Sequence, residues 1–246
     1  MMIYDIADLR IGIQNEHPYT TRFCANYLSP DQSSAVDVSA SVTQADLEEE
    51  RSQSPNFSIG YIENICLYRN ICLQLPNLDR MLLHAAILEY EGQAYAFLGR
   101  SGTGKSTHTG LWLKYLQGSK IVNGDKPILS ITDDEVIAYG TPWMGKEGRG
   151  CNTKAPLKGL CFLRQAKENS IRKLSPAETA SLLFTQVLMP SEESAAAKTL
   201  ELMDKLIANV PAWQLSCDIS EEAVCKSYEA MTDKKYNLNK NGDNSL

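Results

Sequence analysis

Eight consecutive residues near the middle of the chain have the types and spacing of a phosphate-binding loop. Residues 99–106 read Gly-Arg-Ser-Gly-Thr-Gly-Lys-Ser, so that two glycines bracket four residues before a lysine and a serine. In this Walker A pattern backbone N–H groups surround a phosphate, the lysine neutralises β- and γ-phosphate oxygens, and the serine hydroxyl ligates Mg²⁺. The residues predicted to bind a nucleotide are Gly99, Arg100, Ser101, Gly102, Thr103, Gly104, Lys105, Ser106 and Thr107.

The segments on either side of the loop fit this interpretation. The apolar residues 94–98 predict a buried strand that runs into the loop, and residues 105–116 predict a helix that leaves it. The N-terminus of that helix adds positive partial charge where a phosphate would bind. The alternative is a glycine-rich turn without a ligand. The complete pattern in this context favours binding of ATP with Mg²⁺.

One carboxylate is placed to act beside this loop. A strand over residues 120–122 follows the loop helix and ends at Asn123-Gly124-Asp125. Asp125 should therefore emerge beside the phosphates, where it can hold Mg²⁺ together with Ser106 or align an attacking hydroxyl. The alternative is an ordinary turn in which Gly124 supplies a positive φ. We predict that Asp125 and Lys105 are catalytic, and that Ser106 and Asp125 are the metal ligands.

The chain has three histidines, and one of them is a third catalytic candidate. His84 interrupts the apolar strand predicted over residues 81–90, whose hairpin partner leads into the loop. It can be a core histidine with satisfied ring nitrogens, or its ring can lie beside the γ-phosphate. His108 is expected on the exposed side of the loop helix, and His17 is given no role.

A glycine-rich segment further along the chain is a candidate lid. Residues 141–152 follow Gly140 and contain three further glycines, at positions 145, 148 and 150, which make the segment flexible. Its Lys146 and Arg149 could fold over a phosphate. The alternative is a surface loop with solvated charges, anchored in the core by Trp143. Because phosphoryl transfer is accelerated by positive charge at the equatorial oxygens, we favour the first interpretation.

Composition excludes several classes of function. The formal net charge of −6, with no basic stripe, argues against a nucleic-acid partner. No apolar run approaches the roughly 20 residues that span a bilayer, and no signal peptide is evident, so no membrane partner is expected. The seven cysteines form no Cys-x-x-Cys pair, which indicates free thiols in a reducing cytoplasm. The histidines show no zinc-ligand spacing.

The pattern of elements predicts an α/β fold with a mixed β-sheet flanked by helices. Residues 1–56 read as a β-rich extension or substrate-docking element, with strands at 3–6, 11–13, 23–27 and 36–42 and an acidic helix capped by Thr43 and Asp46. Residues 57–232 read as the nucleotide-binding domain. Its helices are expected from residue 62 to Pro76, at 105–116, 176 onward, 193–208 and 220–231; its later strands at 127–131, 135–139, 157–163, 170–174 and 213–217. Residues 233–246 are expected to be a disordered tail.

The motif at residues 97–107 resembles that of phosphoenolpyruvate carboxykinases and of HPr kinase/phosphorylases, which share a Ser-Gly-x-Gly-Lys-Ser/Thr core. The resemblance is specific at residues 84–106, and is closest to small HPr-kinase-like proteins. It implies a P-loop fold of that class, an Asp-Asp pair at the position occupied here by Gly124-Asp125, and a histidine matched by His84. The Glu-Ile-Arg-Gly-Leu-Gly signature of authentic HPr kinases is absent, and residues 146–150 read Lys-Glu-Gly-Arg-Gly instead.

The leading hypothesis is therefore an ATP- and Mg²⁺-dependent kinase that moves a γ-phosphoryl group to a hydroxyl. The resemblance implies a serine hydroxyl of a peptide, protein or small molecule as acceptor. The alternative is a nucleotide-binding regulatory module with little or no turnover, which the single matched acid would suit. A phosphate-dependent reverse reaction and a homo-oligomer both stay open.

Overall fold

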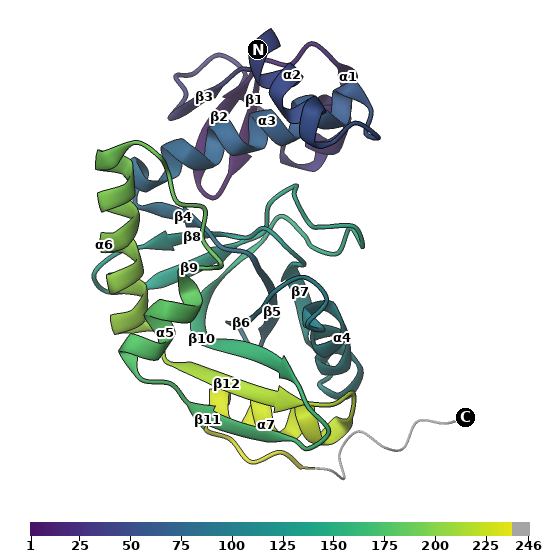
Figure 1. Cartoon of the computed structure of the whole chain (residues 1–246), viewed down its shortest axis with the longest axis vertical. Coiled ribbons are helices and arrows are strands. Elements are labelled where there is room, and N and C mark those ends of the chain that lie inside the picture. Colours follow the sequence, from purple (N-terminus) through teal and green to yellow (C-terminus); the bar gives the residue numbers. More distant parts are fainter. Residues whose placement is uncertain (238–246) are drawn as a thin grey trace.

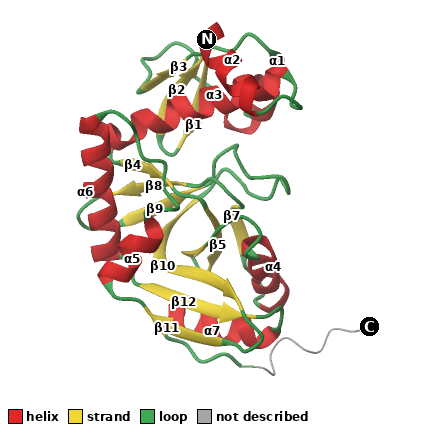
Figure 2. Ribbon diagram, in the orientation of Figure 1, coloured by secondary structure: helices red, strands yellow, loops and turns green. Residues whose placement is uncertain are grey.

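The computed structural model describes residues 1–237 as a mixed α/β protein in which two sheets are flanked by helices (Figures 1 and 2). Residues 238–246 of the predicted tail lie outside the described residues. Within the described part, no helix is long and apolar enough to cross a membrane.

The N-terminal residues form a small sheet of three strands with helices beside it, at the top of Figure 1. β2 pairs antiparallel with β1 and parallel with β3. The capping box predicted for the acidic helix is present, because the Thr43 side chain accepts from the Asp46 backbone and the Asp46 side chain accepts from the Thr43 backbone. The elements are β1 (Met2–Ile6), β2 (Leu9–Ile13), α1 (Pro18–Phe23), the 3₁₀ helix η1 (Ala25–Tyr27), β3 (Val38–Ala40), α2 (Gln44–Gln53), α3 (Ile59–Gln74) and the 3₁₀ helix η2 (Leu75–Leu78).

The strand predicted at residues 23–27 is wrong. This segment is the end of α1 followed by η1. Pro18 occupies the first turn of α1, where its fixed φ favours a helix and its missing N–H costs nothing. The expected strand at residues 36–42 is real but shorter, since β3 covers only Val38–Ala40.

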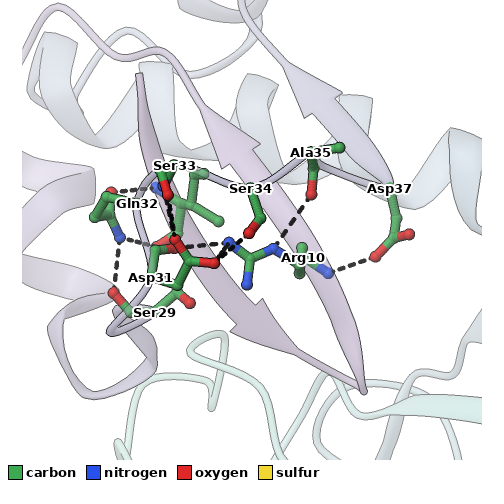
Figure 3. A network of polar contacts seen from close by, with 9 residues as sticks. Arg10, Ser29, Asp31, Gln32, Ser33, Ser34, Ala35 and Asp37 are labelled. Carbon is green, nitrogen blue, oxygen red and sulfur yellow. Dashed lines mark hydrogen bonds and ion pairs between the residues drawn. The ribbon is translucent and has the colours of Figure 1, made fainter.

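A polar network fixes the loop that connects η1 to β3 (Figure 3). The Arg10 guanidinium donates to the carbonyls of Asp31 and Ala35 at 2.7 and 3.2 Å. The Asp37 carboxylate accepts from the Arg10 backbone N–H at 2.7 Å, and the Asp31 carboxylate accepts from the Ser34 hydroxyl. One side chain of β2 therefore positions a loop that has few apolar residues of its own.

The second sheet has nine strands in the order β4-β8-β9-β10-β6-β5-β7, with β12 beside β10 and β11 beside β12. Its long strand β10 pairs antiparallel with β9 through its first residues and parallel with β6 and β12 through its later ones. The strands are β4 (Arg80–Leu82), β5 (Ala85–Tyr90), β6 (Gln93–Leu98), β7 (Lys120–Asn123), β8 (Ile128–Ile131), β9 (Val136–Tyr139), β10 (Lys154–Gln165), β11 (Ser170–Lys173) and β12 (Ala212–Cys217).

Helices cover both faces of this sheet. The remaining helices are α4 (Lys105–Tyr115), α5 (Pro176–Leu183), α6 (Glu193–Asn209) and α7 (Glu221–Thr232). Successive side chains of a strand point to opposite faces. In β6, Ala96 and Leu98 accordingly belong to the core under α5 and α6, whereas Tyr95 and Phe97 belong to the core under α4 and α7. This two-sided burial explains why the strand reads as a continuous apolar run.

The segment predicted as one strand over residues 81–90 is two strands, β4 and β5, with His84 at the break. β4 pairs with β8, whereas β5 pairs with β6 and β7, so the chain changes neighbours at this point. The backbone N–H of His84 donates to the Gln186 carbonyl at 2.7 Å, and that of Ala85 donates to the Asp125 carbonyl at 3.1 Å. The break places the His84 side chain at an edge of the sheet rather than within a strand.

The small sheet shares a core with the β4 end of the large one. Tyr4, Ile6 and Ile11 lie in the same buried cluster as Leu82 and Ile128. The contact is extended by polar groups, since Tyr139 Oη donates to Asp8 Oδ2 at 2.7 Å and Lys154 Nζ donates to the same oxygen at 2.5 Å. The N-terminal helices are thereby held next to the edge of the large sheet where β5 begins.

Candidate functional site

The glycine-rich loop connects β6 directly to α4 and has the backbone geometry that its glycines permit. Gly99, Gly102 and Gly104 have φ values of 150°, 82° and 100°. A Cβ at Gly99 would lie 2.6 Å from Thr103 Oγ1, so only glycine fits there. Thr103 closes the loop, because its backbone N–H and its hydroxyl both donate to the Arg100 carbonyl, at 3.2 and 2.8 Å.

The strands place three predicted side chains together at the mouth of this loop. β6 and β7 are both antiparallel to β5, which lies between them, so their carboxyl ends and the beginning of β5 meet at one edge. His84 Nε2 lies 3.2 Å from Asp125 Oδ1 and 3.3 Å from Lys105 Nζ. Lys105 Nζ also donates to the Gly99 carbonyl at 2.8 Å. Residues separated by up to 41 positions (84 to 125) thus form one cluster.

The protons of this cluster cannot satisfy both contacts of His84 at once. Lys105 Nζ is a donor only, so Nε2 must lack a proton to accept from it, whereas Nε2 must carry one to donate to Asp125. If the Lys105 ammonium moved away from Nε2 toward an anion, Nε2 could carry a proton and donate it in a hydrogen bond to Asp125 Oδ1. In the arrangement of these three side chains, only one of the two contacts of His84 Nε2 can be a hydrogen bond at a time.

Burial and neighbouring charges act on the two ionisable groups nearest the loop. Burial is the largest influence on Asp125 and raises its pKa, but the hydrogen bond from His84 and the charges of Lys126 and Lys105 together lower it below its ordinary value. Burial lowers the pKa of Lys105, and Asp125 partly opposes this effect. Asp125 is consequently a carboxylate at neutral pH, although it is not freely solvated.

Asn123 holds Asp125 in place, a role that the sequence reasoning did not assign. Asn123 is completely buried, and its Oδ1 accepts from the backbone N–H groups of Asp125 and Lys126 at 2.8 and 2.7 Å. Its Nδ2 donates to the carbonyl and hydroxyl of Thr141 at 3.2 and 3.0 Å, and the Thr141 hydroxyl donates to the Lys126 carbonyl at 2.8 Å. Asparagine commonly accepts from the backbone two residues on, so the Asn-Gly-Asp turn itself was the available signal.

A cavity of about 510 Å³ lies over the cluster and the loop. Of the predicted nucleotide-binding residues, the cavity is lined by Ser101, Gly102, Gly104, Lys105, Ser106 and Thr107. Gly99, Arg100 and Thr103 do not line it but shape the loop, and Arg100 is exposed. Of the residues 141–152 that we considered as a lid, residues 144–147 and Arg149 line this cavity. They include Lys146, and Glu147, whose Oε2 lies 3.3 Å from Arg149 Nε.

This second loop packs closely against the Asp125 turn. A Cβ at Gly124 would lie 2.9 Å from the Met144 carbonyl and 3.1 Å from the Arg149 carbonyl, which explains why no second acidic side chain occupies that position. Gly145 has a φ of +77°, and a Cβ there would lie 2.9 Å from Asp125 Cβ. Trp143 is buried, as expected of an anchor, and its ring lies 4.6 Å from that of Tyr68.

The prediction that His108 lies on the exposed side of α4 is wrong. His108 is buried against Phe97 at a ring distance of 4.8 Å, and its Nε2 lies 3.0 Å from Ser227 Oγ. The same hydroxyl accepts from Trp112 Nε1 at 2.9 Å. Burial lowers the pKa of His108 to about 4, so the ring is neutral and joins α4 to α7.

Oxygen donors suited to Mg²⁺ are present, but a complete protein-only metal site is not. Among residues 1–237, no group of three or more His, Cys, Asp or Glu side chains could hold a metal ion. Ser106 and Asp125 line the same cavity and offer a hydroxyl and a carboxylate oxygen. Mg²⁺ prefers such hard ligands and is commonly held by one or two of them together with nucleotide phosphates and water.

Comparison with known proteins gives a distant structural resemblance and no family. No family model matches the chain, and no curated protein matches it. Among solved structures, the chain is similar to the Hpr(Ser) kinase/phosphatase from Coxiella burnetii, at 13% identity over 49% of this chain and 86% of that one, with a TM-score of 0.26. This is a distant resemblance of fold.

Proposed function

We propose that this chain is a kinase, which binds ATP·Mg²⁺ in the cavity over the glycine-rich loop and transfers the γ-phosphoryl group to a hydroxyl. We also propose that its nucleotide-binding part has the P-loop fold of HPr kinases and phosphoenolpyruvate carboxykinases. The observation that carries the proposal is the convergence of Lys105, His84 and Asp125 at the loop. The Walker A pattern and the helix that follows it supply the phosphate-binding half of the argument.

Each residue has a role that follows from its position. The N–H groups at the start of α4 and the Lys105 ammonium bind phosphate oxygens. Lys105 then leaves its contacts with the Gly99 carbonyl and with His84, and the His84 ring donates to Asp125. Lys146 adds positive charge from the lining of the cavity, and Arg149 adds more when it leaves Glu147 for a phosphate oxygen. N–H groups and cations placed around the phosphate in this way stabilise the negative charge on the phosphoryl group as it is transferred.

The transfer itself needs an acceptor oxygen opposite the bond that breaks. Asp125 accepts a hydrogen bond from the acceptor hydroxyl, the acceptor oxygen bonds to the γ-phosphorus, and the bond from phosphorus to the β–γ bridging oxygen breaks. The proton of the hydroxyl passes to Asp125 and then to solvent. Because the transition state is loose, alignment matters more than basicity, so the low pKa of Asp125 is compatible with this role.

Ser106 and Asp125 would hold Mg²⁺ between the phosphates and the protein. The ion would supply charge neutralisation on the β- and γ-phosphate oxygens when bound. The remaining coordination positions would be filled by phosphate oxygens and water, as is usual for this metal.

One observation favours a second candidate function, a nucleotide-binding regulatory module with little turnover. The backbone of residues 144–149 closes the space beside Gly124, so Asp125 has no second acidic neighbour in this turn. Two carboxylates would share metal binding and alignment of the acceptor, whereas one must do both. A module of this kind would bind the same ATP·Mg²⁺ without transferring phosphate.

Two variants and two measurements test the proposal. Calorimetry with ATP and MgCl₂ measures binding, and transfer from γ-labelled ATP to serine-containing peptides measures turnover. Lys105→Met should lower ATP affinity at least tenfold, because it removes the ammonium and retains the apolar stem. Asp125→Asn should bind ATP but lower the transfer rate about 10²–10⁴-fold.

The outcomes separate the candidates. Magnesium-dependent heat with wild-type protein and no transfer to any hydroxyl or to water would establish the regulatory module. Equal transfer by wild type and Asp125→Asn would overturn the role of Asp125. Absence of any heat with folded protein would overturn nucleotide binding altogether.

A further inference from the structure

A second cleft lies against the same His84–Asp125 pair, on the side of the N-terminal helices. Its volume is about 890 Å³, and it shares His84, Asp125, Gly145 and Lys146 with the cavity over the glycine-rich loop. The pair therefore forms part of the wall of both spaces. A group bound in one space and a group bound in the other would meet at Asp125.

We propose that this cleft binds the phosphate acceptor, and that the acceptor is an extended peptide segment with a large apolar side chain and an acidic side chain near its hydroxyl. The inference rests on the proposed kinase function and specifies its substrate class. Three independent features of the wall carry it: exposed aromatic rings, cations without salt bridges, and buried polar atoms without partners.

Aromatic side chains from α1 and α3 form the outer wall of the cleft. Tyr19, Phe23 and Tyr61 line it, and the Tyr19 ring lies 5.7 Å from each of the other two. Phe23 is 38% exposed, and Phe57, which packs on Tyr61 at 4.6 Å, is 52% exposed. Clustered exposed rings beside a cleft are typical of a surface that binds apolar side chains.

The charges of the cleft favour an acidic partner. Among the described residues, its lining includes Lys126, Lys146 and Arg69 but only one carboxylate, that of Asp125. Arg69 is already bound to Glu50 at 2.6 Å. Within residues 1–237, neither the Lys126 nor the Lys146 ammonium forms a hydrogen bond or a salt bridge. An acidic side chain of the acceptor would give these two cations a partner.

The residues that line the cleft also contain buried polar atoms without hydrogen-bond partners among the described residues. Asn64, Trp143 and Gln186 line the cleft and are 3%, 6% and 5% exposed. In the described part of the chain, Asn64 Oδ1, Trp143 Nε1 and Gln186 Oε1 have no hydrogen-bond partner. Such atoms destabilise a structure unless they are paired. An extended peptide offers both N–H donors and C=O acceptors along its length, and small rotations of these side chains toward it would pair them.

The test uses an array of nine-residue peptides with a central serine and one flanking position fixed at a time, each incubated with γ-labelled ATP·Mg²⁺. We expect the strongest labelling for peptides that carry Phe or Trp at one flank and Asp or Glu at the other. Replacing the acidic residue of the best peptide by Gln and then by Lys should raise its KM stepwise. A matching peptide with alanine in place of serine should accept no label.

Variants of the outer wall locate the binding. Phe23→Ala and Tyr61→Ala should each raise the peptide KM at least tenfold, and leave the KM for ATP and the heat of ATP binding unchanged. Leu200→Ala is the matched control, because Leu200 is 46% exposed on α6 and does not line the cleft. Its peptide KM should equal that of the wild type.

Failure of this inference is distinct from failure of the kinase proposal. Labelling without preference for aromatic and acidic flanks, or with unchanged peptide KM in both wall variants, would overturn the acceptor cleft while the kinase proposal stands. The same holds if small alcohols are phosphorylated and no peptide is. Loss of magnesium-dependent ATP binding in the wild type would overturn both.

Discussion

Replacement of Asn123 by alanine should cost both stability and any activity that depends on Asp125. Asn123 is the buried side chain that accepts from the backbone N–H groups of the Asp125 turn: its Oδ1 accepts from two of them and its Nδ2 donates to Thr141. An alanine side chain can neither accept nor donate any of these hydrogen bonds. The residue has no other described role, so the variant isolates the value of positioning the carboxylate.

The magnitude follows from the groups left without partners. Two backbone N–H groups lose an acceptor at about 1–3 kcal/mol each, and the half-exposed positions of Asp125 and Lys126 place the cost near the lower end because water can replace part of it. The Thr141 oxygens lose a donor, which costs less. We therefore expect the free energy of unfolding to fall by about 2–5 kcal/mol. At about 2–4 °C per kcal/mol for a chain of this size, Tm falls by roughly 4–20 °C.

Urea unfolding followed by circular dichroism measures the stability, and calorimetry and label transfer measure function at a temperature where the variant is folded. We expect ATP affinity within about threefold of wild type and a transfer rate at least tenfold lower. Asn152→Ala is the matched control, since the side chain of this exposed asparagine makes one hydrogen bond within residues 1–237, to the Asn26 carbonyl at 3.5 Å, and should lose less than about 0.5 kcal/mol. If Asn123→Ala is as stable as Asn152→Ala, the network does not hold the turn and the reasoning is refuted.

Two further predictions concern backbone strain and pH. Gly145→Ala should lose about 1–2 kcal/mol of stability from its positive φ and at least tenfold in transfer rate, because the new Cβ would press on Asp125. Gly148→Ala, at φ +59° with nothing within 4 Å, should lose only the stability; equal transfer rates in the two variants would contradict the close contact. The pKa of His108 is about 4 in the folded protein and 6.5 in the unfolded chain. The stability that the neutral, buried ring contributes is therefore complete above pH 6.5 and is lost as the pH falls toward 4. The urea unfolding free energy should fall by about 2 kcal/mol between pH 7.5 and 5, and His108→Gln should lose this part of the dependence; an unchanged slope in the variant would show that His108 is not responsible.

The local part of the site could be predicted because it depends on local sequence. The phosphate-binding pattern, the strand before it and the helix after it are fixed by residues within about 25 positions, through glycine conformations and apolar runs. The capping box of α2 is likewise a contact over three residues. In each case one segment contains all the groups that determine its conformation.

The parts that failed depend on contacts far along the chain. The exposed face of α4 could not be distinguished, because the side that carries His108 is covered by α7, more than 100 residues later. The strand break at His84 arises because β4 and β5 pair with different neighbours. The hydrophobic pattern of residues 81–90 contains no information about these partners. The helix at residues 18–23 is not predicted, because the pattern assigns no element to residues 18–22, gives Phe23 to a strand, and does not use Pro18 as a helix start.

Asp125 connects the cavity over the glycine-rich loop with the second cleft, because it lines both of them. Gly124 and Gly145 let the loop at residues 144–149 lie directly against the Asp125 turn. A side chain at either position would displace the turn or the loop that carries Lys146. The two glycines thus have a role that no pattern of chemical groups reveals: they allow a loop to pack against the turn of a carboxylate that lines two cavities. In a protein that transfers a phosphoryl group between two bound molecules, this shared wall is where the reacting oxygen must lie.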